Sequence, residues 1–239
     1  MIYQKILNSK GKEKLFALLL DPDKCNNEHL AKLLSVAMQG RVSMLMVGGS
    51  LVNADINSFI SEIRKLSQLP IVLFPGNAMQ LSNNADAILL LSLISGRNPE
   101  FLIGSHVLVS RSIKNSGIEV IPTGYMLIDG GTQTSVQYMS NTIPIPSNKI
   151  DIAVATALAG EQLGLKQIYL EAGSGAKNPV PIEMIRAIRN EISIPIIVGG
   201  GLKTPEQVKA AWSAGADIVV VGNAIENDLE SLPSFLSLI

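Results

Sequence analysis

Glu171 ends a short apolar run, "QIYLE" (167–171), and the turn sequence "AGSGAKNP" (172–179) follows it at once. Glycine and serine in such a turn offer backbone N–H groups and a hydroxyl to an anion, so the turn predicts a phosphate site. Alternate side chains of a strand share one face, so Tyr169 and Glu171 are expected to point to the same side. A carboxylate there lies close to whatever the phosphate carries. The alternative is an ion-paired or solvated glutamate at a strand end.

Two further glycine-rich turns follow later apolar runs, in "VGGGLKTPEQ" (198–207) and "VVVGNAIEND" (219–228). Glycine lacks a Cβ, so backbone N–H groups can approach an anion closely in such turns. Each turn alone is better explained as a tight connection between a strand and a helix. The two together favour a phosphate cradle formed by Gly200, Gly201, Gly222 and Asn223.

A third group of polar residues follows the first two apolar runs, in "LLLDPDK" (18–24) and "MVGGSLVN" (46–53). A carboxylate from Asp21 and a hydroxyl from Ser50 are hard oxygen ligands, which suit Mg²⁺ shared with substrate phosphates. An Asp-Pro-Asp sequence is also typical of a turn and helix cap, and Asp23 is expected to be such a cap.

Eight apolar runs rich in Val, Ile and Leu, each followed by turn residues and most by a helical pattern, indicate repeated strand-helix units. The chain of 239 residues has the length of one (β/α)8 barrel. We therefore expect an α/β fold, a single-domain TIM barrel over residues 1–239. Its third helix is expected to be short or missing, because 75–86 is too short to hold it. The expected strands are 15–20, 42–47, 70–74, 87–94, 118–127, 167–171, 195–199 and 217–222.

Three local expectations follow from this arrangement. Thr204, Pro205, Gln207 and Gly215 are the cap, first residue, capping-box partner and stop of a helix. In the sixth strand the residues that alternate with Glu171 should pack against helices. The irregular stretch 129–148 follows the fifth strand at the functional end of the barrel and is a candidate lid.

The composition excludes several classes of protein. The formal charge is −1 and no run of Lys or Arg occurs, so nucleic acid is not an expected partner. The single cysteine, Cys25, excludes an internal disulfide, and His29 and His106 lack the spacing of a histidine metal site. The polar N-terminus and the lack of an apolar stretch of about 20 residues predict a cytoplasmic protein.

Taken together, these segments resemble the geranylgeranylglyceryl phosphate and heptaprenylglyceryl phosphate synthase family over nearly the whole chain. The resemblance is carried by "LLLDPDK", "MLMVGGSLV", "PTGYMLIDGGTQTSV", "IYLEAGSGAKNPVP", "VGGGLKTPEQ" and "VVVGNAI". The block "FPGNAMQLSNNADAILLLSLISGRNPEFLIGSHV" (74–107) is similar to the archaeal type that some bacteria also have.

This resemblance implies a Mg²⁺-dependent prenyltransferase that joins a prenyl diphosphate, geranylgeranyl diphosphate above all, to the C3 hydroxyl of sn-glycerol 1-phosphate. It implies that Asp21 and Ser50 hold Mg²⁺ and that Glu171 accepts the hydroxyl proton. The residues implied to bind glycerol 1-phosphate are Tyr169, Leu170, Glu171, Ala172, Gly173, Ser174, Gly175, Gly200, Gly201, Gly222 and Asn223.

The resemblance also implies a homo-oligomer, and a lipid-like product implies transient contact with a membrane. Tyr125 is expected to line the prenyl site, and Trp212 to pack on an outer helix or at an interface. Leu19 departs from family members that carry a lysine two residues before the aspartate. The rival readings are a sugar-phosphate isomerase or aldolase, a flavin-binding barrel, and a phosphate-binding module without catalysis.

Overall fold

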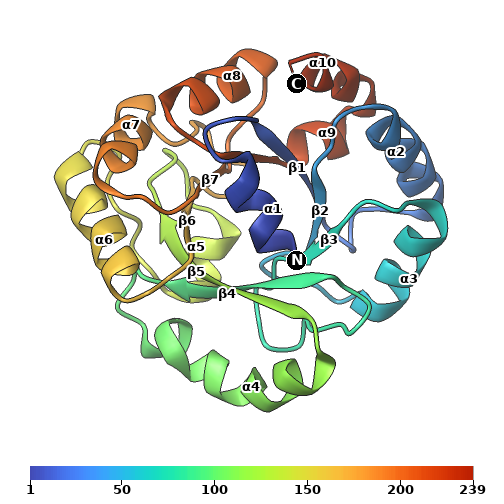
Figure 1. Ribbon diagram of the computed structural model, residues 1–239, viewed down its shortest axis with the longest axis horizontal. Helices are drawn as coiled ribbons and strands as arrows, with labels where there is room; N and C mark the ends of the chain where they lie inside the picture. Colours follow the sequence, from blue (N-terminus) through green and yellow to red (C-terminus); the bar gives the residue numbers. More distant parts are fainter. Residues whose placement is uncertain (239) are drawn as a thin grey trace.

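The computed structural model, which describes residues 1–238, is a closed barrel of eight parallel strands in chain order (Figure 1). The first strand pairs with the last, with Leu15 opposite Ile218, and this pairing closes the sheet. The strands are β1 Leu15–Leu20, β2 Met44–Val47, β3 Ile71–Leu73, β4 Ala87–Leu93, β5 Glu119–Leu127, β6 Gln167–Glu171, β7 Ile196–Gly199 and β8 Ile218–Val221. The predicted fold class is confirmed, and most strands are one or two residues shorter than expected.

A ring of helices surrounds the barrel (Figure 1). Its members are α2 Asn27–Gln39, α3 Ile56–Leu66, α4 Ser105–Ser116 with the preceding π-helical turn η1 Glu100–Gly104, α6 Ile150–Gln162, α7 Ile182–Glu191, α8 Pro205–Ala214 and α10 Leu232–Leu236. Shorter elements are α5 Ser135–Ser140, α9 Asn223–Asn227 and η2 Leu229–Ser231. Between β3 and β4 the described chain forms no helix, so the prediction of a missing third helix is confirmed.

Helix α8 has the ends that its sequence predicts. The Thr204 side chain accepts the Gln207 N–H while the Gln207 side chain accepts the Thr204 N–H, which completes the capping box. Gly215 ends the helix at φ 118°, a left-handed conformation that favours glycine. Trp212 lies on the inner face of α8, edge-on to Phe16, and its role is therefore packing.

Strand alternation creates two apolar cores. Ile168 and Leu170 of β6 belong to the core between sheet and helices, whereas Tyr169 belongs to the core inside the barrel. The expected division of β6 into an inner and an outer face is thus confirmed, and it places Glu171, two residues after Tyr169, at the inner edge of the strand.

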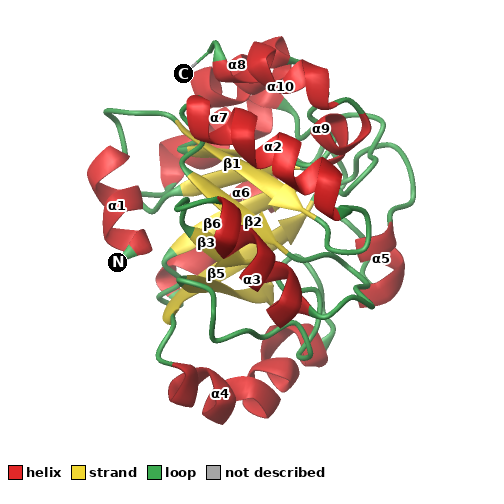
Figure 2. Ribbon diagram, turned by 90° about the vertical axis from the view of Figure 1, so that its right-hand side faces the viewer, coloured by secondary structure: helices red, strands yellow, loops and turns green. Residues whose placement is uncertain are grey.

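The two ends of the barrel differ. Helix α1, Ile2–Ser9, lies at the amino ends of the strands and inserts Ile2 and Ile6 into the inner core. Figure 2 shows α1 at one end of the barrel and α5 at the other. The inner core is therefore covered at the amino end and accessible from the carboxyl end. No helix within residues 1–238 is both long and apolar enough to cross a membrane.

Candidate active site

A cavity of about 280 Å³ opens at the carboxyl ends of the strands. It brings together most of the residues singled out in the sequence, which are Asp21, Ser50, Tyr125, Tyr169, Glu171, Ser174, Gly175, Gly200, Gly201, Gly222 and Asn223. Leu170 and Ala172 do not line it, because their side chains pack between sheet and helices. Gly173 does not line it either. Ser135 and Val136 of the stretch 129–148 also line the cavity, so part of the candidate lid borders it.

Glu171 is the buried carboxyl group of this cavity, with 5% of the residue exposed. Burial raises the pKa of Glu171 to about 7, although the Gly173 N–H, which donates to Oε1 at 2.7 Å, and the neighbouring Tyr169 hydroxyl act in the opposite direction. A carboxyl group with this pKa exchanges a proton readily near neutral pH, as a general base must.

Gly200 makes room for this carboxyl group. A Cβ at Gly200 would overlap Glu171 Oε1, and the backbone φ of 78° also favours glycine. The glycine predicted for the phosphate cradle therefore has a second role, which is to let the loop after β7 pass close to the base.

Backbone donors surround the outer part of the cavity. Within residues 1–238 no protein acceptor takes the N–H groups of Ser174, Gly175, Gly200, Gly201 or Gly222. The Ser174 hydroxyl donates to Asn223 Oδ1 at 2.9 Å and so connects the loops after β6 and β8. Unpaired N–H groups at the mouth of a barrel, in the loops after β6, β7 and β8, form an arrangement suited to a phosphate group.

Asp21 and Ser50 lie on the other side of the mouth, in the loops after β1 and β2. A Cβ placed on Gly49 would lie 3.4 Å from Asp21 Oδ2, so the carboxylate faces the loop that carries Ser50. The described residues contain no group of three or more His, Cys, Asp or Glu able to hold a metal. One carboxylate and one hydroxyl still fit Mg²⁺, which commonly takes its remaining ligands from water and substrate phosphates.

The expectation for Asp23 is wrong. Asn26 is the cap of α2 and accepts the His29 N–H at 2.9 Å. The Asp23 carboxylate instead accepts the N–H groups of Asn53 and Ala54, which lower the pKa of Asp23. Asp23 therefore fastens the β1 loop to the β2 loop, and this contact between distant segments has no local signal in the sequence.

Three charged residues of the cavity were not singled out from the sequence: Lys24, Lys203 and Glu226. Lys24 Nζ lies 3.2 Å from Asp21 Oδ2 and 3.5 Å from Glu226 Oε2. The signals were present, since Lys24 ends "DPDK" and Glu226 lies four residues after Gly222, but only the closed barrel brings the two loops together. Leu19 lies against Gly222, where a Cβ on the glycine would be 3.3 Å from Leu19 Cβ.

Three aromatic rings form the floor of the cavity. Phe74 stacks on Tyr169 with ring centroids 5.0 Å apart, and Tyr125 lies 5.4 Å from Tyr169. The buried Tyr169 hydroxyl has no hydrogen-bond partner of standard geometry among the described residues. Burial and the Glu171 carboxylate raise the pKa of Tyr169 well above its usual range, so this hydroxyl remains a donor.

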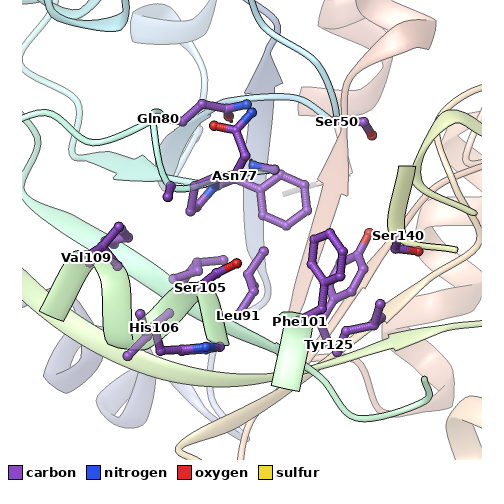
Figure 3. A pocket seen from close by; sticks show the side chains of 18 of the residues that line it. Ser50, Asn77, Gln80, Leu91, Phe101, Ser105, His106, Val109, Tyr125 and Ser140 are labelled. Carbon is purple, nitrogen blue, oxygen red and sulfur yellow. Dashed lines mark hydrogen bonds between the residues drawn. The ribbon is translucent and has the colours of Figure 1, made fainter. Parts of the chain in front are cut away.

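A second, apolar cavity joins the first and lies between the β3–β4 loop and α4 (Figure 3). Both cavities share Gly49, Ser50, Phe74, Tyr125 and Val136. Leu91, Phe101 and Val109 line the second cavity, and in Figure 3 Ser50 and Val109 lie at its opposite ends. It occupies the sector of the ring where the helix between β3 and β4 is missing.

The fold and the site define a (β/α)8 barrel whose mouth carries unpaired backbone N–H groups, a buried carboxyl group and an adjoining apolar cavity. The chain belongs to the PcrB family, whose family model matches residues 8–236. It is 50% identical over 227 residues to the geranylgeranylglyceryl phosphate synthase of Spirosoma linguale, covering 95% of this chain and 91% of that protein. The Chitinophaga pinensis synthase is also 50% identical, over 229 residues, covering 95% and 91%.

A solved structure of a geranylgeranylglyceryl phosphate synthase is also similar to this chain. The crystal structure of (S)-3-O-geranylgeranylglyceryl phosphate synthase from Thermoplasma acidophilum, in complex with its substrate sn-glycerol-1-phosphate, superposes with a TM-score of 0.92. The sequences are 31% identical, and the match covers 99% of this chain and 97% of that one.

Proposed function

We propose that the protein is a prenyltransferase that joins a long-chain prenyl diphosphate, geranylgeranyl diphosphate above all, to the C3 hydroxyl of sn-glycerol 1-phosphate. The relatives named above support this activity, as does the glycerol phosphate bound to the Thermoplasma enzyme. The observation that carries the proposal is the position of Glu171, a buried carboxyl group in a cavity that is bordered by unpaired backbone N–H groups and adjoins an apolar cavity.

The acceptor is held by its phosphate. The free N–H groups of the loops after β6, β7 and β8 bind this group, and Asn223, positioned by Ser174, lies beside them. Fixing one end of a three-carbon molecule leaves its distal hydroxyl facing Glu171 and the Tyr169 hydroxyl. This orientation replaces a random encounter by a defined one, which is a large part of the rate enhancement.

The reaction then transfers a prenyl group. The C3 oxygen of glycerol phosphate bonds to C1 of the prenyl chain, and the bond from C1 to the diphosphate oxygen breaks with its electron pair leaving on diphosphate. Glu171 accepts the hydroxyl proton, so atoms and charge balance. The aromatic rings of Phe74, Tyr125 and Tyr169 line the cavity and can stabilise positive charge that develops on the allylic carbon.

Asp21 and Ser50 are the residues proposed to hold Mg²⁺. When bound there, the ion would act as a Lewis acid and stabilise the negative charge of the departing diphosphate. Ser50 lines both cavities, and Asp21 lines the first one facing Gly49, which also lines both, so the diphosphate of a donor whose chain occupies the apolar cavity reaches them without passing the acceptor.

The decisive experiment is incubation of the protein with sn-glycerol 1-phosphate, Mg²⁺ and prenyl diphosphates of several lengths, with products identified by mass. An ether product that disappears in chelator supports the proposal. Binding of glycerol 1-phosphate without product favours a binding module. Turnover of sugar phosphates favours an isomerase or aldolase, and a yellow protein indicates a flavin.

Homo-oligomerisation, cytoplasmic location and transient membrane contact remain predictions. Exposed apolar side chains on and near α4 and α5, including Val107, Leu108 and Tyr138, offer surface for such contacts. Sedimentation velocity and co-flotation with lipid vesicles measure the first and the last.

A further inference from the structure

Lys24 connects the two halves of the active-site mouth. Its ammonium group lies between Asp21 Oδ2, at 3.2 Å, and Glu226 Oε2, at 3.5 Å. The other oxygen of Glu226 accepts the Asp21 backbone N–H at 3.2 Å. Glu226 belongs to α9, which begins at the predicted cradle residue Asn223, directly after Gly222. All three charged side chains line the cavity.

The charges of the mouth do not suit two polyanionic substrates without rearrangement. Among the described residues that line the cavity, three carboxylic acids, Asp21, Glu171 and Glu226, face two lysines, Lys24 and Lys203. Both proposed substrates carry phosphate groups. Asp21 and Glu226 each form an ion pair with Lys24, so the structure holds a partly exposed cation at the mouth of the cavity.

Metal binding at Asp21 would change its contact with Lys24. If the Asp21 carboxylate held Mg²⁺ together with Ser50, it could not also retain the ammonium group of Lys24 as its main partner. Lys24 would then remain paired with Glu226, and its ammonium group would be free to donate to another anion. Its side chain is 48% exposed and sits on a flexible stem, so it can turn without repacking the core.

We propose that Lys24 binds the diphosphate oxygens of the prenyl donor and that Glu226 positions Lys24 for this contact. The inference rests on the proposed function and assigns a role to two residues beyond the metal ligands and the base. Glu226 acts only through Lys24, and it is a positioning residue.

The donor is the favoured ligand because of where the two lysines lie. Lys203 belongs to the loop after β7, beside Gly200 and Gly201, and donates to the Lys177 carbonyl at 3.3 Å. It therefore lies on the side of the acceptor phosphate. Lys24 follows Asp21 in the loop after β1 and pairs with it, and Asp21 faces Gly49, a residue that the apolar cavity shares with the first cavity. Each phosphorylated substrate thus has one lysine on its own side of the mouth.

The test measures binding rather than turnover. Inorganic diphosphate is titrated by calorimetry into the full-length protein in the presence of Mg²⁺, and sn-glycerol 1-phosphate is titrated separately. Lys24→Met removes the charge and keeps an unbranched side chain. Its matched control is Lys32→Met, because Lys32 pairs with Glu28 at 2.8 Å on the exposed face of α2, away from the cavity.

We expect Lys24→Met to raise the Kd of diphosphate by roughly 10- to 100-fold, the range of a lost charge-assisted hydrogen bond. Its Kd for glycerol 1-phosphate should stay within about twofold, and Lys32→Met should match the wild type for both ligands. An unchanged Kd for diphosphate in Lys24→Met overturns the assignment of Lys24. A rise confined to glycerol 1-phosphate overturns the choice of donor over acceptor.

Glu226→Gln separates positioning from a general structural effect, since the glutamine oxygen can still accept the Asp21 N–H. The change should weaken diphosphate binding in the wild-type background and have no weakening effect in the Lys24→Met background. Equal weakening in both backgrounds overturns the role of Glu226. If the wild type makes product and Lys24→Met binds diphosphate normally, only this inference is wrong. If the wild type neither binds diphosphate nor makes product, the proposed function is wrong as well.

Discussion

Glu171 is buried, and burial disfavours the ionised form of its carboxyl group. Its folded-state pKa of about 7 is above the ordinary 4.5, so the folded protein binds this proton more tightly than the unfolded chain. The stabilising effect is full below the ordinary pKa and is lost as the pH rises through about 7. At alkaline pH the ionised Glu171 therefore lowers the free energy of unfolding, which a neutral side chain at this position would not do.

The first prediction concerns this cost. Glu171→Gln should raise the Tm relative to the wild type at pH 8, where the wild-type carboxyl group is forced to ionise, and should have little effect at pH 4. Thermal unfolding at both values checks it. A variant that is less stable than the wild type at pH 8 would show that Glu171 is a structural partner whose charge the fold requires.

The same variant tests catalysis. Glutamine keeps the size of Glu171 and most of its hydrogen bonding but cannot accept the proton of the acceptor hydroxyl. A fall in kcat of roughly 10²- to 10⁴-fold is expected, with a far smaller change in the KM for glycerol 1-phosphate. Steady-state kinetics on the preparation used for unfolding checks this. A rate within about threefold of the wild type, far short of that range, would remove Glu171 from the reaction.

At the scale of elements, the amino end of the barrel contributes stability and no catalysis. Asp217 precedes β8 and accepts both the first N–H of β7, from Ile196 at 2.9 Å, and Arg189 Nη1 of α7 at 3.0 Å. Asp86 has the same role before β4, where it accepts the Ile71 N–H and pairs with Arg64. The Asp86 side chain is much more exposed, at 40% against 7%.

This pair of sites gives the second stability prediction. Asp217→Ala leaves Arg189 largely buried and without its carboxylate, so a loss of about 3 kcal/mol is expected. Asp86→Ala should lower the free energy of unfolding by clearly less, because Asp86 is more exposed to solvent. Urea unfolding measures both, and kcat of the folded protein should be unchanged in each. Equal losses would mean that burial does not set the strength of these contacts.

The same elements show what the sequence can predict. Local patterns predicted the eight strands, the capping box of α8 and the inward face of β6, because periodicity and caps act within a few residues. The clamp from Asp23 to Asn53 and the pairing of Lys24 with Glu226 were not predicted. They join loops that are distant in the chain, and the sequence gives no side-chain direction for a loop.

At the scale of the molecule, an interrupted ring of helices shapes the site. The segment between β3 and β4 runs as a loop, and the surface that a helix would cover is the apolar cavity beside α4. The missing helix was predictable from the short connection. The cavity was not, because any barrel core is rich in the same apolar residues. This cavity shares Ser50 and Tyr125 with the first cavity, so the missing helix provides space for a long substrate next to the site.

The last prediction uses this continuity. Val109 lines the end of the cavity that lies far from Ser50 (Figure 3), so Val109→Phe should shorten the space for a prenyl chain bound with its diphosphate at Ser50. Forcing a long chain against the new ring costs about 1–3 kcal/mol. The ratio of kcat/KM for geranylgeranyl over farnesyl diphosphate should therefore fall by roughly tenfold, while the value for farnesyl diphosphate stays near that of the wild type.

Val107→Phe is the matched control, because Val107 is on the same helix but is 65% exposed and does not line the cavity. It should leave the ratio unchanged. Competition between the two donors, with products resolved by mass, measures the ratio directly. If Val109→Phe lowers the values for both donors equally, the ring disturbs the site as a whole and the chain does not extend toward α4. If it lowers neither, the prenyl chain lies outside this cavity, because a chain that filled it could not avoid the added ring.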